Sequence, residues 1–329
     1  MKKVISILAV IAMLLSFAAC DSSSSDGSST DADATAKVYQ IGICQLVQHE
    51  ALDAATKGFK DALTEKLGDK VKFDEQKASG ELTNCVTITS KFVSDKVDLI
   101  FANATDALAA ASQATDTIPV VATSITDYAT ALGIDNWTGK TGFNVTGTSD
   151  LAPLADQAAM IKELVPSAKT VAILYCSGEK NSKYQSNVMT EELSKLGITA
   201  KEYTFVDTND VTSVTQQIVT DKCDAVFVPT DNTAASNTEA INNVLEPAKI
   251  PVVAGESGIC KGCGIATLSI SYYDIGYKSG EMAYEILVNG ANPGDMEIEY
   301  AKELTKQYMA SRATALGIAI PEDYEAIAE

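Results

Sequence analysis

Two segments of this 329-residue chain carry the same pattern and decide its fold: SDKVDLIFANATDALAAAS at 94–112 and TDKCDAVFVPTDNTAAS at 220–236. Each contains an aspartate followed three residues later by a phenylalanine. Each continues to the sequence IPVVA, at 118–122 in the first copy and at 250–254 in the second. Landmarks that recur in the same order indicate that one structural unit occurs twice in the chain.

Within each copy, short apolar segments alternate with segments of helical periodicity. The strands expected in the first copy are 39–44, 71–75, 98–102 and 119–122, and those in the second are 170–175, 200–205, 224–228 and 251–253. The helices expected around them include 81–95, 151–165, 184–196, 211–221, 233–245 and 270–290. Alternating strands and helices build parallel sheets that are covered on both faces. The sequence therefore predicts an α/β protein with two doubly wound, Rossmann-like lobes and a cleft between them.

The first 37 residues have a different character from the rest. Residues 1–19 contain two lysines, an apolar run and small residues, which is the pattern of an export signal. Residues 20–37 begin with Cys20 and are rich in Ser and Asp, with almost no apolar side chain larger than Ala. Such a composition is typical of a flexible tether. The cysteine at the expected cleavage point resembles the lipid-attachment residue of bacterial lipoproteins.

Charge and cysteine content exclude several classes of function. The formal net charge is −19 and no basic stripe is present, which argues against nucleic-acid binding. Cys260 and Cys263 form a CxxC pattern, but His49 is the only histidine, so no second ligand pair for a metal is evident. A local disulfide and two free thiols both remain open for this pattern. No nucleophile motif or phosphate-binding loop is found, so an enzyme is the weaker alternative, and neither cofactor nor metal is expected.

Ligands of open parallel sheets bind beyond the carboxyl ends of the strands, and six loops fall there. They are 45–50, 103–106, 123–127, 177–182, 229–233 and 255–258. Free N–H groups at the helix starts that follow these loops are suited to a carboxylate, and the carboxylates of Asp231 and Glu256 to an ammonium group. This pairing predicts an α-amino acid as the ligand. For Thr105, Ser124 and Asp231, helix capping is the competing interpretation.

An ordered set of motifs covers residues 38–329 and resembles one family. The motifs are QLVQHEALD, GFKDAL, KFVSDKVDLIFANAT, FNVTGTSDL, IKELVPSAKTVAILYCSGEKNS, VPTDNTAASN, IPVVAGE and YYDIGYKSGEMA. They are similar to the substrate-binding proteins of ABC transporters associated with tryptophan and tyrosine uptake, which have the type I periplasmic-binding fold. The chain departs from that family at Glu50, where Pro is common, and at Cys44 and Cys176, where Thr or Asn is frequent.

The resemblance implies three crossover strands that act as a hinge between the lobes. It divides the chain into an N-terminal lobe of 38–147 plus 271–296 and a C-terminal lobe of 148–270 plus 297–329. It also implies an extracytoplasmic monomer that is held to the membrane by lipid at Cys20. The expected ligand is an amino acid, with an aromatic one as the first choice. The expected protein partners are an ABC permease and its ATPase. A ligand sensor of the same fold, and a binder of another amino acid or of a nucleoside, are the alternatives.

The complete set of expected ligand-binding residues combines the loop argument with the resemblance. It comprises Gln45, His49, Ala104, Thr105, Thr123, Ser124, Asn144, Ser177, Asn181, Asp231, Asn232 and Glu256. His49 lies where a strand gives way to a helix and has no second histidine to form a metal site with. We expect it to be a wall of the pocket, with helix capping at the rim as the alternative.

Overall fold

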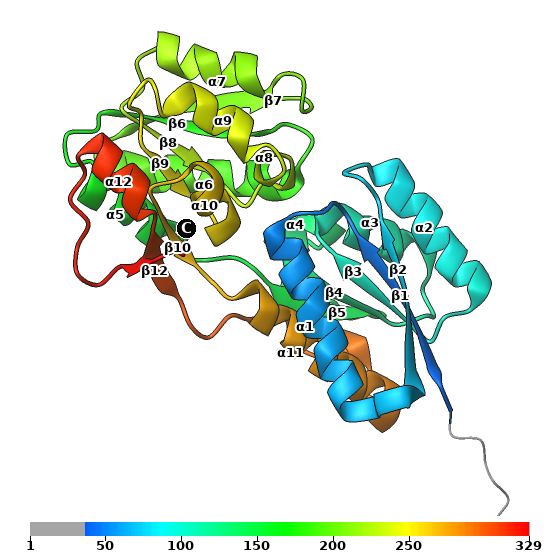
Figure 1. Cartoon of the computed structure of the whole chain (residues 1–329). Helices are drawn as coiled ribbons and strands as arrows, with labels where there is room; N and C mark the ends of the chain where they lie inside the picture. Colours follow the sequence, from blue (N-terminus) through cyan, green and yellow to red (C-terminus); the bar gives the residue numbers. More distant parts are fainter. Residues whose placement is uncertain (1–36, 329) are drawn as a thin grey trace, which may run out of the picture. The chain divides into compact units, whose positions relative to one another are not determined.

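Two sheets of mostly parallel strands form the framework of the computed structural model, which describes residues 37–328 (Figure 1). The first sheet has the order β11-β5-β4-β3-β1-β2, and all its paired strands are parallel. Its strands are β1 (Tyr39–Gln45), β2 (Val71–Lys77), β3 (Leu99–Asn103), β4 (Val120–Ile125), β5 (Val145–Ser149) and β11 (Glu299–Tyr300). The β1, β3 and β4 strands carry long runs of buried residues, which suits a sheet with helices on both faces.

The second sheet has the order β13-β12-β10-β9-β8-β6-β7, and only the β10–β12 pair is antiparallel. Its strands are β6 (Thr170–Cys176), β7 (Thr199–Phe205), β8 (Ala225–Val228), β9 (Val252–Ala254), β10 (Ala266–Ser269), β12 (Thr305–Tyr308) and β13 (Glu325–Ala326). The predicted α/β class with two doubly wound lobes is confirmed. The signal at 1–19, Cys20 and nearly all of the 20–37 tether lie outside the described residues.

Helices of the first lobe are α1 (Glu50–Leu67), α2 (Leu82–Asp95), α3 (Thr105–Ala114), α4 (Tyr128–Leu132) and α11 (Tyr272–Asn289). Helices of the second lobe are α5 (Leu154–Leu164), α6 (Lys180–Lys195), α7 (Val211–Thr220), α8 (Asn232–Ala235), α9 (Thr238–Leu245), α10 (Ser257–Cys263) and α12 (Ala310–Leu316). Single 3₁₀ turns lie at η1 (Gly68–Lys70) and η2 (Pro293–Asp295). The single helix expected at 233–245 is wrong. Asn237 leaves the helical region, with φ −131° and ψ 26°, and separates α8 from α9.

Three segments carry the chain between the two sheets. They are 150–153 after β5, 270–271 after β10, and 301–304 after β11 (Figure 1). The division of the chain into lobes at 147/148, 270/271 and 296/297 stays a prediction. The sheet pairing differs from it in detail, because β5 extends to Ser149 and β11 pairs with β5 in the first sheet. The last crossing therefore follows Tyr300.

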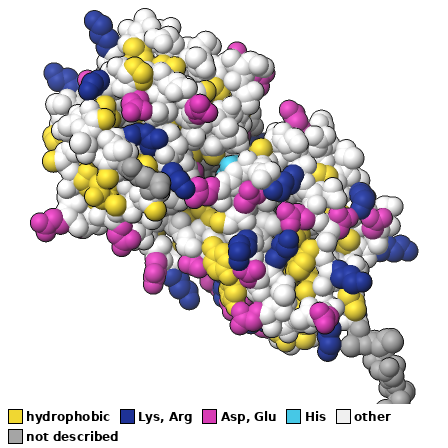
Figure 2. Space-filling view, viewed as in Figure 1, with side chains coloured by type: hydrophobic (Ala, Val, Ile, Leu, Met, Phe, Trp, Pro, Cys, Tyr) yellow, Lys and Arg dark blue, Asp and Glu magenta, His cyan; other side chains and the backbone are white. Residues whose placement is uncertain are grey.

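The face of the molecule in Figure 2 bears Lys and Arg side chains interspersed with Asp and Glu. Charged side chains of the described residues form ion pairs on the surface, such as Lys60 with Glu75 and Lys183 with Glu202. Such pairs contribute little to stability. The two-sided burial of the sheets, with Phe59 stacked on Phe101 in the first lobe and Phe227 buried in the second, is the main stabilising feature.

Candidate functional site

A small cavity lies where loops of both lobes meet. Six residues expected from the sequence line it: His49, Ser124, Asn181, Asp231, Asn232 and Glu256. Six others were missed: Leu52, Asp150, Thr230, Ala235, Ile259 and Tyr272. The free space is about 10 Å³, enough for about one water molecule. In this arrangement the cavity is therefore too small for an amino acid, and its walls have to move outward to admit one.

Four of the expected residues are instead bonded within their own lobes. Gln45 donates to the Val47 carbonyl and to Asp53, and so shapes the loop that leads into α1. The Thr123 hydroxyl pairs with the Thr148 hydroxyl at 2.8 Å. The Ser177 hydroxyl donates to the Phe205 carbonyl, and the Asn144 amide donates to the Thr115 and Ile118 carbonyls. Asn144 precedes β5 at the amino ends of the strands, so the structure places it at the opposite edge of the sheet from the cavity.

Ala104 and Thr105 begin α3 but do not line the cavity. Ala104 has a φ of 93°, a region that residues with a side chain rarely adopt. Ser124 also has a positive φ, 58°, and unlike Ala104 it does face the cavity. Strained backbone of this kind is concentrated at functional sites.

Ser124 differs from its neighbours in lacking a partner. Its hydroxyl is buried and is one of five buried side-chain atoms between residues 37 and 328 without a hydrogen bond. The other four belong to Asn103, Thr146, Gln157 and Thr267, none of which lines the cavity. A buried hydroxyl without a hydrogen-bond partner destabilises the folded protein by about 1–3 kcal/mol. Its position at the cavity wall marks it as a donor that a ligand can satisfy.

A series of hydrogen bonds runs from His49 to the second lobe. The Nε2 of His49 lies 3.2 Å from the Oδ1 of Asn232. The Nδ2 of Asn232 donates to Glu179, so its Oδ1 is the acceptor and His49 carries the proton on Nε2. Burial lowers the pKa of His49 below its ordinary value of 6.5, which keeps the ring neutral at pH 7. His49 is thus a wall of the cavity that contacts both lobes.

Glu179 accepts the hydrogen bonds at the second-lobe end of this series. Its carboxylate accepts hydrogen bonds from the backbone N–H groups of Asn232 and Thr233 and from the side chains of Asn181, Asn232 and Thr233. Asp231 accepts from the N–H groups of Cys176 and Ala234 and from the Ser182 hydroxyl. The N–H groups at the start of α8 are therefore already bonded to carboxylates of the protein.

The same is true at α10, where Glu256 accepts from the N–H groups of Gly258 and Ile259. Asp231 and Glu256, the second-lobe acids expected from the sequence to bind an ammonium group, are instead bonded to the helix starts of their own lobe. Burial raises the pKa of Asp231 and raises that of Glu256 to about 7. Both acids cap helices, as the competing interpretation of the sequence held for Asp231.

Asp150 is bonded differently from these three acids. It lies in the first crossing segment, is 5% exposed, and accepts from the Tyr272 hydroxyl at 2.8 Å and the Thr126 hydroxyl at 3.1 Å. The Thr230 hydroxyl is a further partner and lies 3.3 Å from that of Thr126. Hydroxyl groups rotate and can turn to other acceptors, whereas a backbone N–H cannot. Asp150 also has its own backbone N–H as a partner, but its other partners are hydroxyls, so it is the acid in the cavity that can exchange most of its partners.

Glu256→Gln is expected to stabilise the protein at pH 8 and to have little or no such effect at pH 4. Because the pKa of Glu256 is raised from 4.5 to about 7, its charge disfavours the folded state above pH 7, and that cost disappears as the pH falls below 4.5. The neutral amide avoids the charge but keeps only one of the two capping acceptors, so we expect a net gain of about 2 kcal/mol at pH 8. Urea unfolding at both pH values measures it, with Glu281→Gln, whose side chain is 41% exposed, as the control. An equal difference at the two pH values would contradict the prediction.

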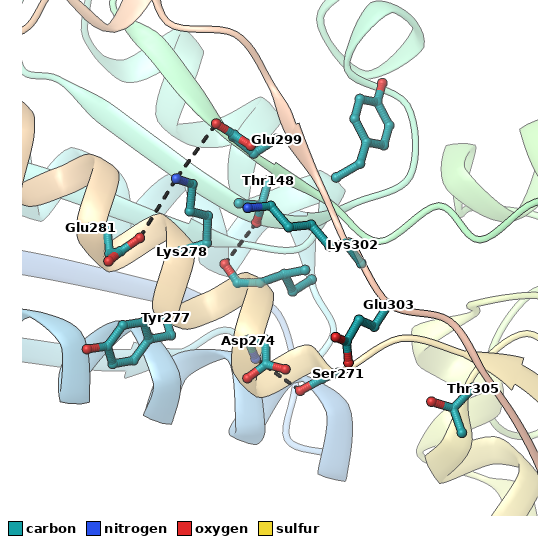
Figure 3. Close-up of a pocket in the computed structure, with 13 residues that line it drawn as sticks. Thr148, Ser271, Asp274, Tyr277, Lys278, Glu281, Glu299, Lys302, Glu303 and Thr305 are labelled. Atoms are coloured by element: carbon teal, nitrogen blue, oxygen red, sulfur yellow. Dashed lines mark hydrogen bonds and ion pairs between the residues drawn. The ribbon is translucent and has the colours of Figure 1, made fainter.

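A larger cavity, of about 450 Å³, lies between α11 and the third crossing segment. Figure 3 shows Lys278 in it, between Glu281 and Glu299, at 3.8 and 3.7 Å. Lys302 and Glu303 are exposed there. None of the buried polar atoms without a partner, among the described residues, belongs to this cavity. The cleft cavity, which contains the free Ser124 hydroxyl, is therefore the stronger candidate of these two for a binding site.

Between residues 37 and 328, no group of His, Cys, Asp and Glu side chains is arranged to hold a metal ion. The six cysteines of this region are buried free thiols, including Cys260 and Cys263. Within the same range, no helix has the length and apolar character needed to cross a bilayer.

Comparison with known proteins gives consistent relatives over nearly the whole described region. Residues 40–329 match the family model described as ABC transporter substrate binding protein. A tyrosine-binding protein of Clostridioides difficile (strain R20291) is 35% identical over 304 residues, which cover 90% of this chain and 87% of that protein.

Two solved structures of relatives differ in how well they superpose. An ABC domain in complex with L-Trp from Streptococcus pneumoniae is 32% identical, with a TM-score of 0.84 over 88% of this chain and 100% of that one. A ligand-free, open substrate-binding protein from Clostridium difficile is 36% identical, with a TM-score of 0.68 over 88% of this chain and 99% of that one. The lower score at slightly higher identity indicates that the lobe arrangement here is closer to that of the L-Trp complex.

Proposed function

This chain belongs to the ABC transporter substrate-binding protein family, and on that premise we propose that it captures a free amino acid, aromatic by first expectation, in the cleft between its lobes. The family consists of binding proteins rather than enzymes, and its members have the type I periplasmic-binding fold. The tyrosine and tryptophan named for two relatives support an aromatic ligand.

The observation that carries the proposal is that the same cavity is lined by a buried acid, Asp150, and by the Ser124 hydroxyl, which has no hydrogen-bond partner. The side-chain partners of the buried Asp150 carboxylate are all hydroxyl groups. In our proposal this carboxylate binds the ligand's ammonium group. Ser124 donates to the ligand's carboxylate. No Lys or Arg lies among the described residues that line the cavity, so both charges of the ligand are met by short, buried groups.

Ligand binding would couple to closure because the cavity walls come from both lobes. His49 to Asn232 and Thr126 to Thr230 are direct contacts across the cleft. A ligand that contacts both walls stabilises the closed arrangement by its differential affinity for it. The three crossing segments are the hinge in this proposal, and Asp150 lies within the first of them.

The finer parts of the proposal concern location and partners. We propose that the mature chain begins at a lipidated Cys20, that residues 20–37 tether the lobes to the cell surface, and that a permease with its ATPase receives the ligand from a monomeric binding protein. The export signal and the Ser- and Asp-rich segment support the first two points. A ligand sensor would share every one of these features except the permease.

Isothermal calorimetry with the purified chain tests the ligand. We expect tyrosine, tryptophan or phenylalanine to bind, and adenosine and small aliphatic amino acids to bind at least ten-fold more weakly. A heat of binding for adenosine and for none of the amino acids would identify the ligand as a nucleoside and overturn the proposal. Heat from another amino acid alone would keep the Asp150 and Ser124 roles and overturn only the aromatic class.

A further inference from the structure

We propose that Cys44 and Cys85 are a disulfide-forming pair that can join the strand β1 to the helix α2. The inference does not rest on the proposed function. Both residues are fully buried in the same apolar cluster of the first lobe, and their thiols lie within interaction range, because the Cys85 thiol is the main cause that raises the pKa of Cys44. The loop of chain between them contains His49 and all of α1.

The backbone holds α2 against β1 at two points, so the approach of the thiols does not depend on side-chain rotation alone. Ala78 donates to the Gln45 carbonyl at 2.9 Å and Gly80 donates to the Leu46 carbonyl at 2.8 Å, which fixes the start of α2 to the end of β1. Further along, a Cβ on Gly42 would lie 2.5 Å from the Phe92 ring. Glycine at this position allows the helix to lie directly on the strand.

The other described cysteines lack this strand-to-helix arrangement. Cys260 and Cys263 also interact, but they lie three residues apart within the single helix α10. Cys176 occupies the position of Cys44 in the second copy of the repeat, and its thiol donates to the Val206 carbonyl. The Cys223 thiol lies 3.4 Å from the Tyr203 hydroxyl. Cys263 donates to the Ile259 carbonyl within its own helix. The second copy thus keeps the strand cysteine but has no thiol in the place of Cys85.

Oxidation proceeds by exchange with an external disulfide, either oxidised glutathione or an exported protein disulfide. One thiolate of the pair attacks the external disulfide and releases one thiolate of the donor. The second thiolate attacks the mixed disulfide, forms the Cys44–Cys85 bond and releases the other donor thiolate. The donor disulfide is reduced to two thiols, which take up the two protons that the cysteines lose.

The first turn of α2 provides the access that this exchange needs. Residues 81–84 are exposed, and Glu81 at the N-cap makes no side-chain capping bond. The backbone before this turn is bonded to β1, but the turn itself is solvated and lacks an N-cap side-chain bond, so it is the part of α2 that opens first, and Cys85 follows it directly. Burial and contact with Cys85 raise the pKa of Cys44, so the exchange occurs from this opened state or before folding is complete rather than in the closed core.

Peptide mapping of the full chain tests the pair. The protein is treated with oxidised glutathione, free thiols are blocked with N-ethylmaleimide in denaturant, and the chain is cleaved with trypsin. We expect peptide 38–57 joined to peptide 78–91, lighter than their sum by two hydrogen atoms. Each peptide contains one cysteine, and Lys261 separates Cys260 from Cys263, so every alternative pairing is distinguishable. Blocked Cys44 and Cys85, or separate glutathione adducts on both, would overturn the proposal.

Melting curves give a second readout. We expect oxidised protein to melt roughly 5 °C above protein kept in reductant, because the bond restricts the unfolded chain. The shift should vanish in Cys85→Ser and persist in Cys176→Ser and Cys260→Ser. A shift that is retained in Cys85→Ser, or lost in Cys260→Ser, assigns the effect to another pair and contradicts the assignment.

Discussion

Asp150→Asn is expected to weaken amino-acid binding by about 100-fold while the fold is retained. The substitution removes a charge that meets the ligand's ammonium group in a buried site, a loss of about 3 kcal/mol. Asparagine keeps the size of the side chain and one acceptor for the hydroxyls of Tyr272 and Thr126. Burial also raises the pKa of Asp150, so without ligand the neutral amide costs the folded state little.

Calorimetry with the best ligand of the panel measures this loss, and the melting temperature without ligand reports the fold. Glu50→Gln is the matched control, because Glu50 lies at the rim of the cleft, 65% exposed and 3.5 Å from Lys261. Exposed pairs of this kind contribute less than about 1 kcal/mol, so affinity should fall less than about five-fold. Equal losses in the two variants, or unchanged affinity in Asp150→Asn, would remove Asp150 from the ammonium site.

Asp150 and Asp231 illustrate what the sequence could and could not reveal about the site. Asp231 follows a strand of the repeat, so the loop argument finds it, and the structure places it on the cavity. Its oxygens, however, accept from two backbone N–H groups and a hydroxyl of its own lobe. Sequence gives the position of an acid but not the partners that satisfy it. The role proposed for Asp231 from the sequence therefore passes to Asp150 in our proposal.

Asp150 and Tyr272 were missed in the sequence analysis for a different reason. Asp150 lies in a segment that crosses between the sheets, where neither strand nor helix periodicity applies, and Tyr272 opens α11 directly after the second crossing, where periodicity predicts a helix but not a cavity wall. The repeat predicted the two sheets because Asp98 and Phe101 recur as Asp224 and Phe227 in buried strands. A crossing has no counterpart in the repeated unit. Aspartate before the start of a helix is the one signal that could have drawn attention to Asp150, and it is common at ordinary caps.

Gly276→Ala is expected to lower the melting temperature by roughly 5 °C or more. The helices α1 and α11 lie side by side in the first lobe, and a methyl group on Gly276 would overlap the carbonyl oxygen of Ala55 (Figure 1). Gly58 and Gly280 are equally crowded at this contact, so the helices cannot separate at one point alone. Overpacking costs about 3 kcal/mol here, whereas alanine gains only about 1 kcal/mol in helix propensity.

The same substitution should also disturb the cleft, because both helices begin there. His49 precedes α1 and Tyr272 opens α11, and parallel hydrogen bonds from Tyr273 to Asp61 and from Tyr277 to Glu65 tie the pair together. Val288→Ala is the control, since this residue of α11 is 42% exposed and should change stability by less than about 0.5 kcal/mol. A Gly276→Ala protein that melts at or above the wild-type temperature would show that the two helices pack less closely than described, and the placement of His49 relative to Tyr272 would lose its physical basis.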